Sequence, residues 1–120
     1  MKITTKRIYE SATTNDGTRI LVDRLWPRGV KKENARIDFW AKELAPSNEL
    51  RKCFQHDHEK WEEFRTRYWA ELDAQPSDAM TELKDNVKAG RVTFVFGSKE
   101  EDLNNARALK EYLGANNNGK

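Results

Sequence analysis

Residues 20–29 read ILVDRLWPRG, and this stretch decides the fold that we expect for the chain. The unbroken apolar run at its start is typical of a β-strand buried on both faces, and the proline and glycine that follow end the strand. A second strand of the same kind is predicted at residues 91–96 (RVTFVF), with helical patterns between the two. Buried strands that alternate with helices indicate an α/β fold.

We therefore predict a small, largely parallel sheet of three or four strands with helices on both faces, in a Rossmann-like three-layer arrangement. Residues 2–8 alternate around isoleucines and are expected to form a strand at the sheet edge. Their connection to residues 18–25 is short for a parallel crossover, so these two strands are expected to be antiparallel if they are neighbours. Residues 34–44 fit either a helix face or strand alternation, and we expect a helix.

Capping residues mark the expected helix starts. Ser47, Asp57 and Ser77 each precede apolar residues spaced by three or four positions, which predicts a helix after each. Residues 98–101 (SKEE) have the spacing of a capping box, so the last helix is expected to begin there. The predicted buried helix faces comprise Leu50, Cys53, Phe54, Trp61, Phe64, Tyr68, Leu72, Met80, Leu83, Val87, Leu103, Ala106, Leu109 and Leu113.

The length of 120 residues fits one domain, which we place at residues 1–113, followed by a disordered tail at residues 114–120. Hydrophobic residues make up only 37% of the chain and charged residues 35%, so the core is expected to rely on large aromatic side chains. The single cysteine excludes an internal disulfide, and no apolar stretch is long enough for a membrane span or a signal peptide. We expect a cytoplasmic protein that needs no cofactor to fold.

The net charge of +2 is unevenly distributed along the sequence. Residues 1–42 carry ten Lys or Arg against five Asp or Glu, whereas residues 43–120 carry twelve against fifteen. Such asymmetry could steer an anionic ligand toward the N-terminal part, but it is too weak to indicate a nucleic-acid partner. No membrane partner is expected, and the oligomeric state is left open, a homodimer included.

The candidate site lies at the expected carboxyl ends of the strands, where open α/β sheets bind their ligands. Asp23, Arg24, Trp26 and Arg28 follow the first buried strand, and Lys99 follows the second. Arginine offers a planar fork for a carboxylate or phosphate, tryptophan a stacking face, and aspartate a base or an orienting group. The structural alternative is that Asp23 and Arg24 form a salt bridge while Trp26 belongs to the core.

Three further patterns have more ordinary explanations. The acidic first turn after residue 98 would repel a phosphate at that helix start. Residues 56–58 (HDH) supply too few ligands for zinc, so no metal site is predicted, although His56 stays a candidate acid or base. Cys53 occupies a helix-face position that is typical of buried filler.

Several blocks of the sequence resemble the YeaO-like branch of a large bacterial and archaeal domain family of unknown function. They are LVDRLWPRGV (21–30), DFWAKELAPS (38–47), LRKCFQHD (50–57), KWEEFRTRYWAEL (60–72) and VTFVFGSKEEDLNNA (92–106). The resemblance implies a compact α/β domain with a characteristic DRLWPRG loop, and it implies no established reaction.

The chain departs from this family pattern at the end of the last strand. Relatives usually carry a tyrosine, a Lys-Asp pair and a histidine there, whereas this chain has Phe96, Lys99-Glu100 and Asn105; Lys99 and Asn104 match. Position 53, often a tryptophan, is Cys53. Loss of the histidine removes a proton-transfer group, which favours a binding role over acid–base chemistry.

Three hypotheses follow from the sequence. The first is a domain that binds an anionic small molecule through Arg24, Trp26, Arg28, Lys99 and Asn104. The second is an enzyme of unknown reaction that uses Asp23 or His56 as acid or base. The third is a protein-interaction module in which the tryptophan and arginine of the DRLWPRG loop are hot-spot residues.

Overall fold

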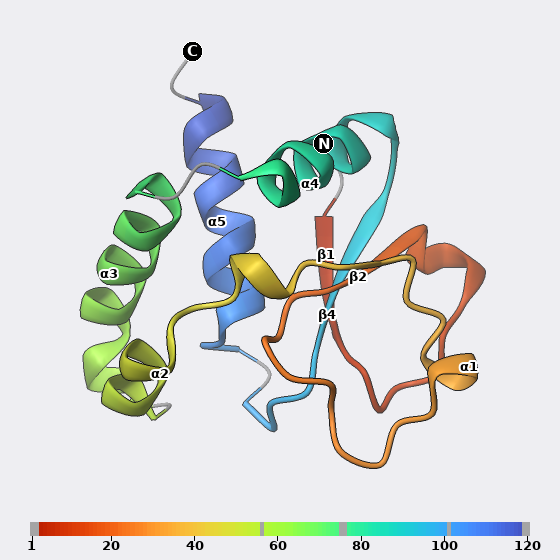
Figure 1. The fold of residues 1–120 in the computed structure, drawn as a ribbon, viewed down its shortest axis with the longest axis horizontal. Helices are drawn as coiled ribbons and strands as arrows, with labels where there is room; N and C mark the ends of the chain where they lie inside the picture. The colour runs from red at the N-terminus through yellow and green to blue at the C-terminus, as the bar shows by residue number, and fades with distance from the viewer. Residues whose placement is uncertain (1–2, 56, 75–76, 101, 119–120) are drawn as a thin grey trace.

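A computed structural model of the chain describes residues 3–55, 57–74, 77–100 and 102–118, with side chains described as far as residue 114. Within these ranges four strands form one sheet: β1 (Ile3–Arg7), β2 (Thr18–Leu21), β3 (Phe39–Trp40) and β4 (Val92–Phe96). The strand order is β1-β4-β2-β3, and every neighbouring pair is parallel. Strands β1, β4 and β2 are labelled in Figure 1. The predicted α/β class with a small parallel sheet is confirmed.

Strand β1 lies at the sheet edge, as its alternating pattern predicted. It does not neighbour β2, because β4 lies between them and pairs in parallel with both, so that Val92 is the register partner of Ile3 on one side and of Thr18 on the other. The short connection from β1 to β2 therefore crosses over β4 instead of forming a hairpin. The antiparallel expectation applied only to neighbouring strands, so this sheet, in which β1 and β2 run parallel on either side of β4, does not meet its condition.

The expected helix at residues 34–44 is wrong. A single helical turn, α1 (Lys32–Ala35), precedes β3, and the 3₁₀ turn η2 (Lys42–Leu44) follows it. Phe39 and Trp40 pair with Ile20 and Leu21 of β2 and pack against opposite hydrophobic clusters, which is the alternation of a strand. Pairing with the open edge of β2 outweighs the helical spacing because the backbone groups of that edge need partners.

Two of the predicted helix caps act as expected. The Ser47 hydroxyl accepts a hydrogen bond from Leu50 N (3.2 Å) at the start of α2 (Asn48–Phe54), and the Ser77 hydroxyl does the same with Met80 N (3.2 Å) at the start of α4 (Asp78–Ala89). Asp57 caps the 3₁₀ turn η3 (His58–Lys60), which leads directly into α3 (Trp61–Ala74). A further 3₁₀ turn, η1 (Thr14–Asp16), precedes β2.

The last helix, α5 (Asn105–Asn118), begins later than the SKEE motif predicted. Asn104 is its cap, because its side-chain oxygen accepts a hydrogen bond from Arg107 N (3.0 Å). Ser98 instead accepts a hydrogen bond from Glu100 N within the preceding loop. The helix continues past Gly114 to Asn118, into the segment predicted as a disordered tail, since extending an existing helix costs less than starting one.

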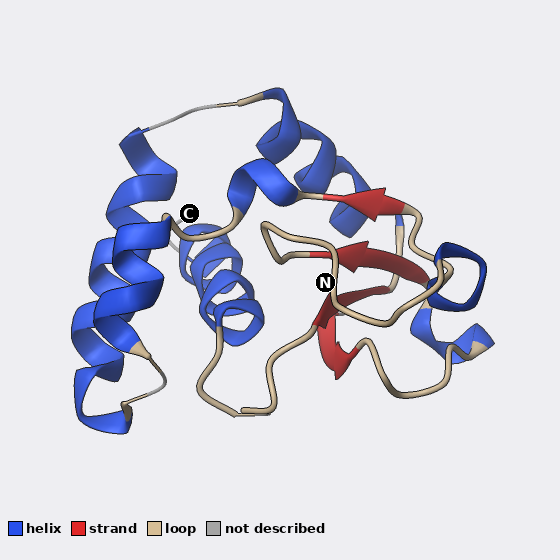
Figure 2. Cartoon of the chain, turned by 60° about the horizontal axis from the view of Figure 1, so that its bottom comes forward, coloured by secondary structure: helices blue, strands red, loops and turns tan. Residues whose placement is uncertain are grey.

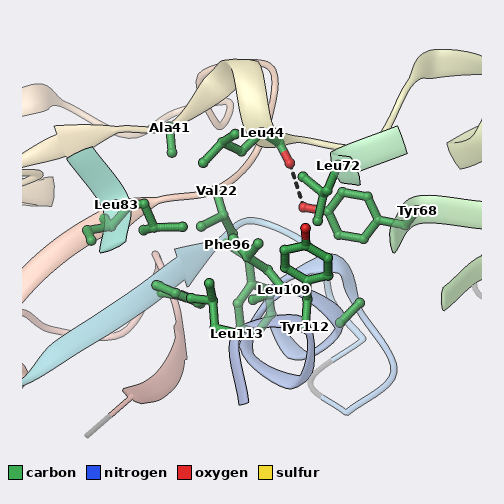
Figure 3. Close-up of a cluster of buried hydrophobic side chains, with 14 of the residues drawn as sticks. Val22, Ala41, Leu44, Tyr68, Leu72, Leu83, Phe96, Leu109, Tyr112 and Leu113 are labelled. Atoms are coloured by element: carbon green, nitrogen blue, oxygen red, sulfur yellow. Dashed lines mark hydrogen bonds between the residues drawn. The ribbon is translucent and has the colours of Figure 1, made fainter. Parts of the chain in front are cut away.

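The sheet separates two hydrophobic clusters of very different size. Ile20, Val22, Phe94 and Phe96 face the larger one, which contains the apolar faces of α2, α3, α4 and α5. Figure 3 shows the part of this cluster where Val22 and Phe96 meet side chains of α3, α4 and α5. The opposite face carries the smaller cluster, which is covered by α1 and the loops around it. The strands thus lie between the single turn α1 and the bundle of α2, α3 and α5 (Figures 1 and 2), so that the second helical layer is minimal.

A buried ion cluster under the smaller layer ties β1, η1 and β2 together. The Asp16 carboxylate pairs with Arg19 (2.6 Å) and with Lys6 (3.1 Å), and it accepts hydrogen bonds from the backbone and hydroxyl of Thr13. Burial by itself would raise the pKa of Asp16, but these donors lower it from 3.8 to about 2. The charged form of Asp16 is therefore the stable form in the folded protein.

We predict that Asp16 makes folding stability depend on acid pH. Because its pKa is lower in the folded chain than in the unfolded chain, its stabilisation is complete above the unfolded pKa and is lost as the pH falls through the folded pKa. The stability difference between wild type and Asp16→Asn should shrink by roughly 2 kcal/mol between about pH 5 and about pH 2. Urea unfolding across this range measures it, and a constant difference would contradict the prediction.

Candidate functional site

A cavity of about 400 Å³ opens at the carboxyl ends of β2 and β4. One side is formed by the residues after β2 and the segment after η2, another by α2, and a third by the turn after β4 and the start of α5. The lining residues are Asp23, Arg24, Leu25, Ala45, Pro46, Arg51, Lys52, Phe54, Gln55, Phe64, Ser98 and Asn105. The sequence placed a site at this edge of the sheet, and the cavity lies there.

The two strand ends meet through the side chain of Asp23. Its Oδ2 accepts a hydrogen bond from Gly97 N (2.8 Å), and its Oδ1 accepts one from Asn105 Nδ2 (3.2 Å). The same Asn105 amide donates to the Val22 carbonyl (3.0 Å). A Cβ at position 97 would lie only 3.2 Å from Asp23 Oδ2, so glycine permits this close approach. The loops after β2 and β4 therefore share one rim.

The environment of Asp23 favours its neutral form more than water does. Burial raises the pKa of Asp23 above its ordinary value of 3.8, although the Gly97 N–H, the Asn105 amide and the charge of Arg51 act in the opposite direction. Asp23 and Arg24 are not an ion pair among the described contacts, contrary to the structural alternative considered from the sequence. The carboxylate is held by neutral donors.

Arg24 is held by backbone carbonyls. Its Nη2 donates to Ala45 O (3.2 Å) and to Pro46 O (3.4 Å), while its buried Nε has no hydrogen-bond partner among the described residues. No described carboxylate forms a salt bridge with this guanidinium. The protein therefore fixes the orientation of the Arg24 guanidinium, and the contacts that fix it are made by neutral groups.

Helix α3 fixes the segment that holds Arg24. The Tyr68 hydroxyl donates to the Leu44 carbonyl (Figure 3), and the Glu71 carboxylate accepts hydrogen bonds from Ser47 N (3.0 Å) and Ser47 Oγ (2.6 Å). Burial raises the pKa of Tyr68, which keeps its hydroxyl a donor. Ala45 and Pro46, whose carbonyls hold Arg24, are thus fixed to α3 through the residue before them, Leu44, and the residue after them, Ser47.

Arg51 and Lys52 of α2 complete the positive lining, and sequence reasoning did not single them out. Both side chains are exposed, and neither forms a salt bridge with a described carboxylate. Adjacent cations on a predicted helix are usually solvated surface residues. The sequence carries no signal that distinguishes them, because the fold alone places α2 beside the strand ends.

Trp26 and Arg28 do not line the cavity. The Trp26 ring packs edge-on against Trp40 with centroids 5.5 Å apart, and its Nε1 donates to Val30 O (2.8 Å) on the smaller-cluster side of the sheet. Arg28 is exposed, and its carbonyl accepts a hydrogen bond from the Tyr9 hydroxyl (3.0 Å). The DRLWPRG loop therefore divides: its first residues face the cavity and its later residues cover the opposite face.

The remaining candidates are also placed away from the lining. Lys99 is exposed and is not among the lining residues, and Asn104 is fully buried as the cap of α5, with its Nδ2 donating to Glu100 O (2.8 Å). His56 lies outside the described residues. Cys53 is half-buried, with its Sγ 3.5 Å from the Arg67 guanidinium.

An ion pair beside the cavity connects two of its walls. His58 Nε2 lies 2.9 Å from Glu100 Oε1, so that η3, which follows α2, is joined to the loop after β4. The hydrogen bond raises the pKa of His58 and lowers that of Glu100 to about 2, with help from the Leu103 and Asp102 N–H groups. Glu100 organises this loop in place of the expected capping box.

The described residues offer neither a metal site nor a membrane span. They contain no group of three or more His, Cys, Asp or Glu side chains placed to hold a metal ion. They also contain no helix with the length and apolar composition that crossing a membrane requires.

Comparisons with known proteins agree with the resemblance found in the sequence. A family model described as the inactive DUF488-N3 subclade matches residues 2–119. The uncharacterised protein YeaO of Escherichia coli (strain K12) is 43% identical over 113 residues, covering 94% of this chain and 97% of the relative. An uncharacterised protein of Mycobacterium tuberculosis (strain H37Rv) is 37% identical over 112 residues, covering 93% of each chain. No solved structure matches the chain significantly.

We predict that Asp23 titrates above its ordinary pKa of 3.8 and that Arg51→Ala raises its pKa further, because the positive charge of Arg51 stabilises the carboxylate. Carboxyl ¹³C NMR measures both values. Arg67→Ala is the matched control, since Arg67 lies outside the cavity lining and pairs with Glu63. An Asp23 that titrates below 3.8, or that does not respond to Arg51→Ala, would show that its surroundings differ from those described.

Proposed function

The chain belongs to the DUF488-N3 subclade described as inactive, and from this premise we propose that it is a cytoplasmic domain that binds an anionic small molecule without transforming it. The ligand is a phosphorylated or carboxylated metabolite. One observation carries the proposal: Arg24, Arg51 and Lys52 line a single cavity, and none of them forms a salt bridge with a described carboxylate. Unpaired cations that converge on a concave site favour an anionic occupant.

Arg24 is the anchoring cation of the proposed site. Its Nη2 is fixed by the Ala45 and Pro46 carbonyls, and these neutral partners leave its charge available. The buried Nε without a partner is a donor that an anionic oxygen or a bridging water would satisfy. A guanidinium held in one orientation loses less entropy when it binds a carboxylate or phosphate.

Asp23 has a positioning role in this proposal. It holds the rim together because its two carboxyl oxygens accept hydrogen bonds from Gly97 N and Asn105 Nδ2. The cations that face it come from the loop after β2 and from α2. Asp23 is the one acidic residue among the described lining residues, and both of its carboxyl oxygens already accept hydrogen bonds from within the protein.

The enzymatic alternative uses Asp23 as the acid or base, and one observation favours it: a carboxyl group with a raised pKa lies in a cavity. Against it, both carboxyl oxygens accept internal hydrogen bonds, and Asn105 stands where the resemblance to the YeaO-like family implies a histidine. An amide cannot transfer protons as an imidazole does. The interaction-module alternative requires Trp26 and Arg28 to contact a partner protein. Arg28 is exposed, but the Trp26 ring is packed against Trp40, which leaves less of it for such a contact.

We predict that inorganic phosphate, titrated at constant ionic strength, shifts the backbone amide NMR signals of the cavity residues. Each charge-assisted contact contributes roughly 1.5–3 kcal/mol, so Arg24→Ala and Arg51→Ala should each weaken binding at least about tenfold. Arg67→Ala, a charge change on α3 outside the cavity lining, should leave the affinity unchanged.

Two further variants test the sequence-based version of the site. If Arg28→Ala or Lys99→Ala weakens phosphate binding as much as Arg51→Ala does, the anion lies over the DRLWPRG loop and not in the cavity. If phosphate causes no shifts around the cavity at any attainable concentration, and carboxylates such as citrate cause none either, the proposed function is wrong.

A further inference from the structure

The cavity has an apolar side as well as a cationic one. Phe54 and Phe64 form its inner wall, both almost fully buried, with their rings stacked at a centroid distance of 4.4 Å. Ala45 and Pro46 add a further apolar surface next to Arg24. These side chains are fixed by the larger hydrophobic cluster and the α3 contacts, so this wall is rigid.

Leu25 brings an exposed apolar side chain to the same cavity. Among the described residues, it is the most exposed large hydrophobic side chain, with 67% of its surface accessible, and it lines this cavity next to Arg24. Neither Asp23 nor Arg24 can cover it, since both are fixed by internal hydrogen bonds. A ligand that places apolar atoms over Leu25 would remove this surface from water.

We propose, resting on the function proposed above, that the ligand is an amphiphilic anion: one phosphate or carboxylate group joined to a compact apolar group. The anionic end faces Arg24, Arg51 and Lys52, while the apolar group lies between Leu25 and the Phe54–Phe64 wall. The volume is sufficient, because a cavity of about 150 Å³ already holds a benzene ring and this one measures about 400 Å³. The mixed lining thus favours an amphiphilic anion over free phosphate, which can use only the cationic side.

The test compares pairs of probes that share an anionic group. Phenyl phosphate is compared with inorganic phosphate, and benzoate with acetate, by the same NMR titration of the full chain. The member with the ring should bind at least about tenfold more tightly, since covering a leucine side chain is worth roughly that factor or more. Whichever pair binds more tightly identifies the anionic group. Nuclear Overhauser effects from ring protons to the Leu25 methyl groups should accompany binding.

Leu25 variants separate this inference from a general preference for larger anions. Leu25→Ser should remove most of the preference for phenyl phosphate without weakening inorganic phosphate, and Leu25→Met should restore it because methionine keeps the apolar contact. Thermal unfolding checks that the variants fold, which is expected for an exposed position.

The outcomes also distinguish the two proposals. If inorganic phosphate and phenyl phosphate bind equally, or if Leu25→Ser keeps the full preference for the ring, the amphiphilic ligand is wrong while anion binding stands. If neither phosphate nor carboxylate probes bind, anion binding itself fails and the inference fails with it.

Discussion

The hydrogen bond from the Gly97 backbone to Asp23 is the contact on which the arrangement of the site depends. It joins the ends of β2 and β4 across a sequence separation of 74 residues, and it needs a residue without a side chain at position 97. Asn105 adds a second contact from the start of α5. With these contacts in place, Asp23 does not pair with Arg24, and the guanidinium is left to the carbonyls of Ala45 and Pro46.

Features set by local chemistry were predictable from the sequence. Ser47 and Ser77 cap the helices that they were expected to cap, and the buried runs at residues 20–22 and 92–96 lie at the centre of the sheet. These predictions succeed because a serine before an amphipathic run, or an uninterrupted apolar run, has few alternative structures. The edge position of β1 follows from its polar alternation in the same way.

Features decided by contacts between distant segments were not predictable. Residues 34–44 carry a helical spacing, but the open edge of β2 pairs with Phe39 and Trp40. Ser98 has the sequence of a cap, yet the helix begins at Asn105. Asn104 caps it instead, because its Oδ1 accepts a hydrogen bond from Arg107 N and its Nδ2 donates one to the Glu100 carbonyl. Trp26 and Arg28 turn away from Asp23 and Arg24, and Arg51 reaches the site from a helix that the sequence gives no reason to place there.

The mixed origin of the cavity lining has an evolutionary consequence. The rim is formed by the loops after β2 and β4, whereas Arg51 and Lys52 project from α2. The buried side of this helix is carried by Leu50 and Phe54. Exposed positions on α2 can therefore change without disturbing the packing beneath them. Paralogues that share this scaffold are free to diverge in what they recognise by substitution along one short helix, while the strand ends stay the same.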